Sequence, residues 1–233
     1  MIIAANLKTN LTRKQTTKYV EELERYIEKH KITQEVLVFP ASSSLDEHQG
    51  RVTIGAQNAY PAQNGAYTGE IGLDHLNEFH ITTILIGHSE RRHILGETQE
   101  ELVAKFNFYK EKGFKIVYCV GEPLEKREAG KDVMMEYISK QYEGIDVNYE
   151  NLIIAYEPVW AIGTGLTPTL EDVKSIHQEL KAKSPAPLLY GGSVKVNNVK
   201  EFLELSNVDG VLVGSAALYV DHFCTMIEYA QNI

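Results

Sequence analysis

The chain has 233 residues, of which 43% are hydrophobic, and its formal net charge at pH 7 is −9. This length and apolar content are enough for a sizeable core, and α/β barrels of this size are commonly single domains. The negative charge disfavours general binding to nucleic acids or acidic membranes, and no apolar run approaches the roughly 18 residues of a membrane span.

Features of the amino terminus and of the cysteines bear on where the protein works. The first residues, Met1 to Asn6, have no basic region of a secretory signal. The two cysteines, Cys119 and Cys224, lie far apart and form neither a metal-ligand spacing nor a disulfide framework. We therefore expect a cytoplasmic protein in which both cysteines are packing residues.

Eight short apolar runs rich in Val and Ile predict eight strands. Most are nearly continuous rather than alternating, which is typical of a parallel sheet covered by helices on both faces. In chain order the runs are Ile2–Ala5, Val36–Phe39, Val52–Ala56, Thr83–Ile86, Ile116–Val120, Leu152–Tyr156, Leu188–Tyr190 and Val211–Val213.

Between many of these runs the apolar residues recur three or four apart, which predicts helices that bury one stripe against the sheet. The clearest stripes are Leu23, Tyr26 and Ile27; Leu102, Phe106 and Tyr109; Val173, Ile176 and Leu180; and Phe223, Met226, Ile227 and Ala230. Thr98 with Glu101, and more weakly Thr169 with Asp172, read as capping boxes at helix starts.

Strand and helix alternate without a linker over residues 1–233, at about 29 residues per unit, the size of βαβ units. Eight such units favour a single-domain α/β barrel of (β/α)8 type. The alternative, a doubly wound sheet, more often has five or six strands and a dinucleotide glycine fingerprint, which this chain lacks.

One irregular stretch, from Asn58 to about Asp74, is unusually long. Loops of this length in compact domains are usually functional or docked onto another surface. Exposed disorder is the alternative, but the stretch contains Tyr60 and Tyr67 and few charges. We expect it to be docked.

Reactive side chains repeatedly follow the predicted strands. Since all parallel strand ends share one face of a barrel, and that face carries the active site in barrel enzymes, these side chains predict a catalytic site. They are Asn6, Lys8, Gln57, Asn58, His88, Glu122, Glu157, Ser193 and Ser215.

The segment from Glu157 to Gly165 has the pattern of a carboxylate followed by a hinged lid. Pro158 stops the strand, glycines flank Thr164, and the apolar residues Trp160, Ala161 and Ile162 lie between. The alternative reading is an ordinary surface turn.

Two glycine-rich turns, Gly191–Gly192–Ser193 and Gly214–Ser215, follow the seventh and eighth predicted strands. Such turns expose backbone N–H groups, and a helix start adds partial positive charge, so they predict a phosphate site without basic side chains. The histidines and cysteines form no metal-binding motif, and no serine-nucleophile motif is present. We expect neither a metal nor a cofactor.

Together these motifs resemble the triosephosphate isomerase family over essentially the whole chain. The segments that carry the resemblance occur in the family's order: Asn6-x-Lys8, Gly55–Asn58, Gly69–Glu70, Ile86–Arg92, Cys119-x-Gly121-Glu122, Ala155–Gly165 and Tyr190–Ser193. The resemblance implies cofactor-free interconversion of dihydroxyacetone phosphate and glyceraldehyde 3-phosphate through an enediol-type intermediate.

The resemblance also implies a role for each site residue. Glu157 is the general base, His88 the electrophile, Lys8 and Asn6 position the substrate, and Glu90 belongs to the same network. The lid comprises Pro158, Val159, Trp160, Ala161, Ile162, Gly163, Thr164 and Gly165, and the phosphate is bound by backbone N–H groups of Gly163, Ser193, Gly214 and Ser215.

Family members are usually homodimers whose third loop enters the neighbouring subunit, which places Thr68 at the dimer contact. One departure is Ser215, where the family commonly has glycine, and it leaves the phosphate geometry there open. Two other functions remain: another phosphosugar isomerase or lyase, and a barrel that binds phosphosugars without turnover. Lys115 begins its predicted strand, on the wrong face for a Schiff-base lyase.

Overall fold

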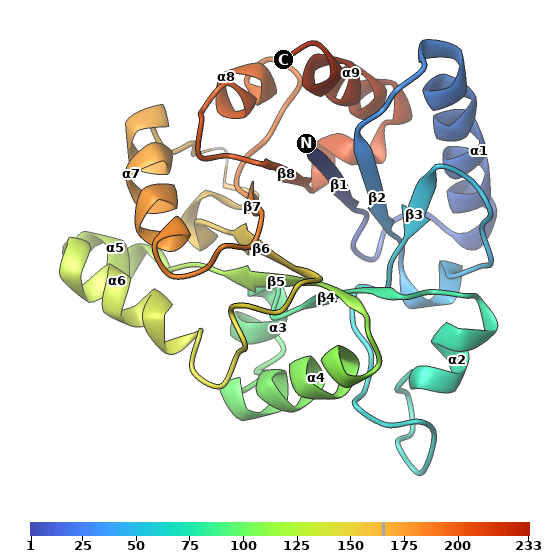
Figure 1. Cartoon of the computed structure of the whole chain (residues 1–233), viewed down its shortest axis with the longest axis horizontal. Helices are drawn as coiled ribbons and strands as arrows, with labels where there is room; N and C mark the ends of the chain where they lie inside the picture. The colour runs from blue at the N-terminus through green and yellow to red at the C-terminus, as the bar shows by residue number, and fades with distance from the viewer. Residues whose placement is uncertain (165) are drawn as a thin grey trace.

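The computed structural model describes residues 1–164 and 166–233, and in it eight parallel strands form a nearly closed barrel surrounded by helices (Figure 1). The predicted (β/α)8 architecture is confirmed. The strands are β1 (Ile2–Asn6), β2 (Glu35–Phe39), β3 (Val52–Ile54), β4 (Thr83–Ile86), β5 (Lys115–Val120), β6 (Leu152–Tyr156), β7 (Leu188–Tyr190) and β8 (Gly210–Val213).

The sheet runs in the order β3-β2-β1-β8-β7-β6-β5-β4, with every pair parallel. Its two edges, β3 and β4, meet through a single bridge between Ala56 and Ile84. Here Ala56 N–H donates to the carbonyl of Thr83 at 2.9 Å, and Leu85 N–H donates to the carbonyl of Ala56 at 2.8 Å.

The predicted strands differ from the observed ones only at their ends. β1, β2, β5 and β8 each include one more residue than predicted: Asn6, Glu35, Lys115 and Gly210. Backbone pairing continues through these residues because the ladder depends on N–H and C=O groups and not on apolar side chains. β3 is shorter than predicted, ending at Ile54, and Ala56 takes part in the closing bridge instead.

The core has two parts because successive strand side chains point to opposite faces of the sheet. One set fills the barrel interior and includes Leu37, Phe39, Val117, Leu189 and Leu212. The other, larger set packs between the strands and the surrounding helices. Both faces of the strands are thus buried, which explains their nearly continuous apolar sequences.

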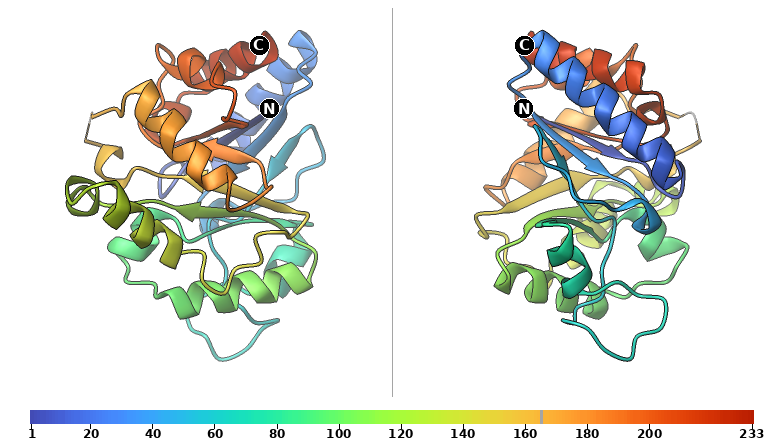
Figure 2. Two further views of the ribbon diagram at one scale, coloured as in Figure 1. Left: turned by 60° about the vertical axis from the view of Figure 1, so that its left-hand side comes forward. Right: turned by 90° about the vertical axis from the view of Figure 1, so that its right-hand side faces the viewer.

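Helices cover the outside of the barrel (Figure 2). They are α1 (Arg13–His30), α2 (Leu73–Glu78), α3 (Ser89–His93), α4 (Gln99–Glu111), α5 (Leu124–Glu128), α6 (Lys131–Lys140), α7 (Leu170–Lys181), α8 (Val199–Leu203) and α9 (Val220–Gln231), with short 3₁₀ segments η1 (Ser42–Ser44), η2 (Val159–Ala161) and η3 (Ser215–Leu218). In the described ranges, no helix combines the length and the apolar character that crossing a bilayer requires.

The predicted caps form at the starts of α4 and α7. Thr98 Oγ1 accepts a hydrogen bond from Glu101 N–H at 3.3 Å, and the Glu101 carboxylate accepts from Thr98 N–H at 2.8 Å. Thr169 and Asp172 make the same reciprocal pair. Each cap satisfies backbone donors that a helix start otherwise leaves unpaired.

The long irregular stretch ends where α2 begins, so Asp74 is helical, and the preceding residues extend away from the barrel (Figure 2). Internal contacts hold the projecting loop together. The rings of Tyr60 and Tyr67 lie 4.0 Å apart, and Asn64 donates a hydrogen bond to the Asp74 carboxylate at 2.5 Å. The loop therefore has a defined shape while its outer residues stay exposed.

Candidate active site

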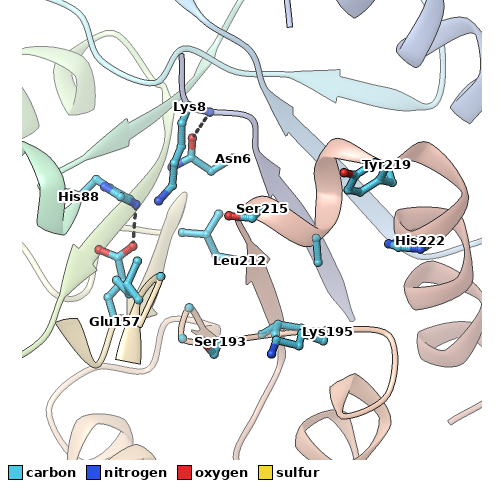
Figure 3. Close-up of a pocket in the computed structure, with 17 residues that line it drawn as sticks. Asn6, Lys8, His88, Glu157, Ser193, Lys195, Leu212, Ser215, Tyr219 and His222 are labelled. Carbon is cyan, nitrogen blue, oxygen red and sulfur yellow. Dashed lines mark hydrogen bonds and ion pairs between the residues drawn. The ribbon is translucent and has the colours of Figure 1, made fainter. Parts of the chain in front are cut away.

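The carboxyl ends of the strands open onto a cavity of about 450 Å³. Every residue predicted to be catalytic or to bind substrate lines it (Figure 3). The lining residues are Asn6, Lys8, His88, Glu157, Ile162, Gly163, Gly191, Gly192, Ser193, Val194, Lys195, Leu212, Gly214, Ser215, Ala216, Tyr219 and His222.

Glu157 follows β6 directly and is only 2% exposed. Its Oε1 lies 2.9 Å from His88 Nε2, and its Oε2 accepts a hydrogen bond from Ser89 N–H at 2.9 Å. Burial by itself raises the pKa of Glu157, but the His88 ring and the Ser89 N–H together lower it by more than burial raises it. The net pKa of Glu157 therefore lies below the ordinary value. The carboxylate is therefore ionised and available as a base.

His88, 6% exposed, caps the amino end of α3. Burial lowers the pKa of His88, whereas the Glu157 carboxylate raises it, and the net pKa lies above the ordinary value. The ring nevertheless has one proton in this arrangement, because Nδ1 accepts a hydrogen bond from Glu90 N–H at 3.2 Å and an imidazolium has no acceptor. We assign the proton to Nε2, which points at Glu157.

Lys8 has a left-handed backbone, with φ of 52°, which is unusual for a residue other than glycine. Neighbours fix this conformation: Asn6 Oδ1 accepts from Lys8 N–H at 3.0 Å, and Gln57 donates to the Lys8 carbonyl at 2.7 Å. The Lys8 ammonium forms an ion pair with Glu90. Asn6 and Lys8 thus project into the cavity beside His88 and Glu157 (Figure 3).

Two glycines allow the backbone to approach Glu157. A Cβ atom at Gly121 would lie 1.8 Å from the Glu157 carbonyl oxygen, and one at Gly191 would lie 3.1 Å from Glu157 Cγ. A side chain at Gly121 is therefore incompatible with this position of Glu157. The glycines of Cys119-x-Gly121-Glu122 and Tyr190-Gly191-Gly192 contribute to placing the carboxylate.

The two glycine-rich turns lie side by side at the cavity (Figure 3). Ser193 follows β7, and Gly214 with Ser215 leads from β8 into η3. Ser215 does not have a positive φ, so a serine there causes no backbone strain. The departure from the family's usual glycine is therefore accommodated.

The amino-terminal part of the predicted lid is anchored to a buried carboxylate. Trp160 Nε1 donates to Glu122 Oε1 at 3.0 Å, Tyr156 OH donates to the same oxygen at 3.1 Å, and the Arg127 guanidinium lies 4.7 Å from the centre of the Trp160 indole. Burial raises the pKa of Glu122, while these donors lower it, and the net pKa lies above the ordinary value. Trp160 is thus held beside the cavity.

Farther along the lid, Ile162 and Gly163 line the cavity, and Gly163 has a φ of 70°. The Ser193 hydroxyl donates to the Ala161 carbonyl at 2.7 Å, linking the lid to the β7 turn. The second predicted hinge residue, Gly165, lies outside the described residues.

Several residues have a role in this site that the sequence alone does not reveal. Gln57 and Glu122 were noted as strand-end residues and as parts of the family's motifs, but nothing in the sequence shows that one holds Lys8 and the other holds Trp160. Lys195, Tyr219 and His222 line the cavity although they lie two to seven residues beyond the strand-end turns. Helical spacing between Tyr219 and His222 was the only signal that these two share a face.

Over the described part of the chain, no group of three or more His, Cys, Asp and Glu side chains is placed to hold a metal ion. The chemistry that these residues can supply is a carboxylate base, a neutral imidazole donor, a lysine charge and two turns of backbone N–H groups. That combination suits proton transfer next to the carbonyl of a phosphorylated substrate.

Comparisons with known proteins agree with this chemistry. A family model described as triosephosphate isomerase matches residues 1–230. A protein named triosephosphate isomerase from Sulfurimonas denitrificans is 73% identical over 233 residues, covering 100% of this chain and 97% of the relative. A protein of the same name from a Sulfurovum strain is 55% identical, covering 97% of this chain and 99% of the relative. Another, from a Nitratiruptor strain, is 50% identical and covers 100% of both chains.

Proposed function

This chain belongs to the triosephosphate isomerase family, and we propose that it interconverts dihydroxyacetone phosphate and D-glyceraldehyde 3-phosphate with Glu157, His88 and Lys8 as its reacting groups. The observation that carries the proposal is the convergence of these three side chains and both glycine-rich turns on one cavity. The reaction places it in glycolysis and gluconeogenesis.

Glu157 moves the proton that is bound to carbon. From dihydroxyacetone phosphate it removes a proton at C1, and the electron pair of that C–H bond becomes the C1–C2 double bond of an enediolate. Return of a proton at C2 gives glyceraldehyde 3-phosphate. Because Glu157 and His88 now contact each other at 2.9 Å, the substrate must enter between them and separate the pair.

His88 and Lys8 stabilise the oxygen on which charge develops. The Nε2–H of His88 donates a hydrogen bond to the carbonyl oxygen, and the Lys8 ammonium supplies fixed positive charge. A glutamate base paired with a neutral histidine is the standard arrangement described for this family. The Glu90 N–H bond to Nδ1 supports the same tautomer here.

The phosphate is bound by backbone N–H groups of Gly163, Ser193, Gly214 and Ser215. Backbone donors at turns and at the start of η3 bind an anion without the desolvation of a basic side chain. Lid closure over the substrate excludes water and strengthens the electrostatic interactions inside.

The lyase alternative is disfavoured by the position of Lys115. It is the first residue of β5 and forms an ion pair with Glu35, at the end of the barrel opposite the cavity. The non-catalytic alternative does not account for a buried carboxylate base held 2.9 Å from a histidine donor.

A coupled assay for triose phosphate interconversion, run with and without a chelator, tests the proposal. Glu157→Gln keeps the side-chain volume but removes the base, so we expect kcat to fall by orders of magnitude with a modest change in KM. His88→Asn should also damage kcat. The control is His177→Asn in α7, away from the cavity, which should leave kcat near normal. Near-normal turnover by Glu157→Gln eliminates Glu157 as the base.

We also propose a homodimer, a cytoplasmic location and a single barrel domain spanning residues 1–233. The dimer is supported by the projecting loop, whose outer residues, including Thr68, are exposed although the loop has a defined shape. Such a loop is well suited to enter a neighbouring subunit. The net charge of −9 supports a small-molecule substrate over nucleic-acid or membrane partners.

A further inference from the structure

The cavity continues beyond the residues that the isomerase reaction uses. Glu157, His88 and Lys8 lie at one end and the two glycine-rich turns in the middle, and Lys195, Tyr219 and His222 lie past the turns at the other end (Figure 3). We call these last three residues the outer arm. A triose phosphate, at about 30 Å³ for each non-hydrogen atom, occupies no more than about 300 Å³. The cavity of about 450 Å³ therefore leaves space for a further group.

The outer arm continues directly from the phosphate-binding turns. Lys195 follows Ser193 by two residues on the β7 side, and Tyr219 and His222 follow Ser215 on the β8 side. Asn198 fixes the first wall, because it accepts a hydrogen bond from Lys195 N–H at 2.7 Å and donates to the Ser193 carbonyl at 3.0 Å. In the second wall the rings of Tyr219 and His222 lie 5.2 Å apart.

The charge of the lining favours an anion. Although the chain has a net charge of −9, Glu157 is the only carboxylate among the described residues that line the cavity, and it lies at the inner end. Within the described residues Lys195 takes part in no ion pair, and Tyr219 is 66% exposed. An ammonium, a phenol and an imidazole therefore offer hydrogen-bond donors next to the phosphate turns.

We propose that the outer arm binds the second phosphoryl group of a diphosphate whose first phosphoryl group occupies the glycine-rich turns. The inference rests on the phosphate site of the proposed function. A diphosphate joins its two anionic groups through one bridging oxygen, which suits an arm that begins only two residues after Ser193 along the chain. Such a ligand places no carbon beside Glu157, so it excludes the substrate and is not turned over.

Isothermal titration calorimetry of the full chain with inorganic phosphate and with inorganic pyrophosphate tests the two sites separately. Both titrations are made without divalent metals and at matched ionic strength, because charge screening alters every anion affinity. We expect each anion to bind once per chain. We also expect pyrophosphate to compete with triose phosphate in the isomerase assay.

The variant Lys195→Gln should weaken pyrophosphate binding by about fivefold, the upper range for one exposed charged contact, and should change phosphate binding much less. The matched control is Lys200→Gln in α8, an exposed lysine five residues away that lies 3.7 Å from Glu204. It removes the same charge outside the cavity and should change neither affinity. The double variant Tyr219→Phe, His222→Gln probes the opposite wall and should weaken pyrophosphate selectively.

Three results would overturn the inference. Equal losses in Lys195→Gln and Lys200→Gln would mean that pyrophosphate responds only to the general field of the protein. If phosphate binds but the pyrophosphate affinity is the same in all variants, the phosphate site at the turns is retained and the proposal for the outer arm is refuted. Failure of phosphate itself to bind would refute the phosphate site of the proposed function, and the outer arm with it.

Discussion

Replacing Gly121 by alanine should displace the proposed base without touching any reacting side chain. The added Cβ would lie 1.8 Å from the Glu157 carbonyl oxygen, whereas real Cβ contacts essentially never fall below 3.0 Å. The two segments must therefore separate by at least about 1.2 Å. Gly121 cannot easily provide this movement, because buried Gln141 hydrogen-bonds to both its N–H and its carbonyl, at 3.0 and 2.7 Å.

Most of the displacement should consequently fall on Glu157. A misplacement of about 1 Å at a catalytic group costs about 100-fold in rate, so we expect kcat to fall about 100-fold. KM should change little, because the Cβ added at Gly121 does not contact the glycine-rich turns that are proposed to bind phosphate. The overpacked backbone should also lower the free energy of unfolding by about 1–3 kcal/mol, which lowers Tm by several degrees.

Steady-state kinetics and thermal unfolding by circular dichroism measure the two effects separately. The matched control is Gly144→Ala, between α6 and β6, where φ is 77° and a Cβ would lie 2.8 Å from Val103. It should lose stability by a similar mechanism but keep normal kcat, because its added Cβ meets the Val103 side chain and not the backbone of Glu157. If folded Gly121→Ala retains kcat within a few-fold, the backbone position of Glu157 does not limit the rate.

Three further predictions concern pH, assembly and the lid. Burial lowers the pKa of His177 from 6.5 to about 4, so the stability that the neutral ring contributes is complete above pH 6.5 and decreases by about 3 kcal/mol as the pH falls to 4. In urea unfolding, the free energy of unfolding of His177→Gln should therefore depend less on pH over this range. The same pH dependence in the variant and the original protein would exclude His177 as the cause. Sedimentation should show one dimeric species, and shortening residues 64–69 should dissociate it; an intact, active dimer would refute docking through this loop. Deleting Ala161–Thr164 should slow proton transfer and raise the share of turnover that ends as methylglyoxal plus inorganic phosphate. The reason is that an enediol phosphate exposed to water expels its phosphate. An unchanged share would mean that the loop is not a protective lid.

The sequence was sufficient to predict which residues follow which strands. Once buried strands are recognised, barrel geometry brings their carboxyl ends together, so residues as distant as Lys8, His88 and Glu157 could be assigned to one site. β4, β6 and β7 have the bounds predicted from their apolar runs. β1, β2, β5 and β8 are longer than predicted because backbone pairing extends into polar residues and glycine, whereas β3 is shorter because Ala56 takes part in the closing bridge.

Contacts that depend on side-chain conformation could not be predicted in this way. The positive φ of Lys8 results from hydrogen bonds to Asn6 and Gln57, and no local preference of lysine favours it. Glu122 and Trp160 are 38 residues apart, and their 3.0 Å contact depends on both rotamers. The same limit applies to Tyr219, whose sequence position indicates a helix start and not a cavity wall.

The single Ala56–Ile84 bridge gives the barrel one place where local opening needs little disruption. Every other pair of neighbouring strands has at least two aligned residue pairs, whereas β3 and β4 have this bridge alone. Amides of Ala56 and Leu85 should therefore exchange with deuterium faster than those in the centre of β6. The projecting loop begins immediately after this seam, so a neighbouring subunit that immobilises the loop would also slow exchange at the seam. Dimer formation could then be measured as slower deuterium exchange at the Ala56 and Leu85 amides in the barrel wall.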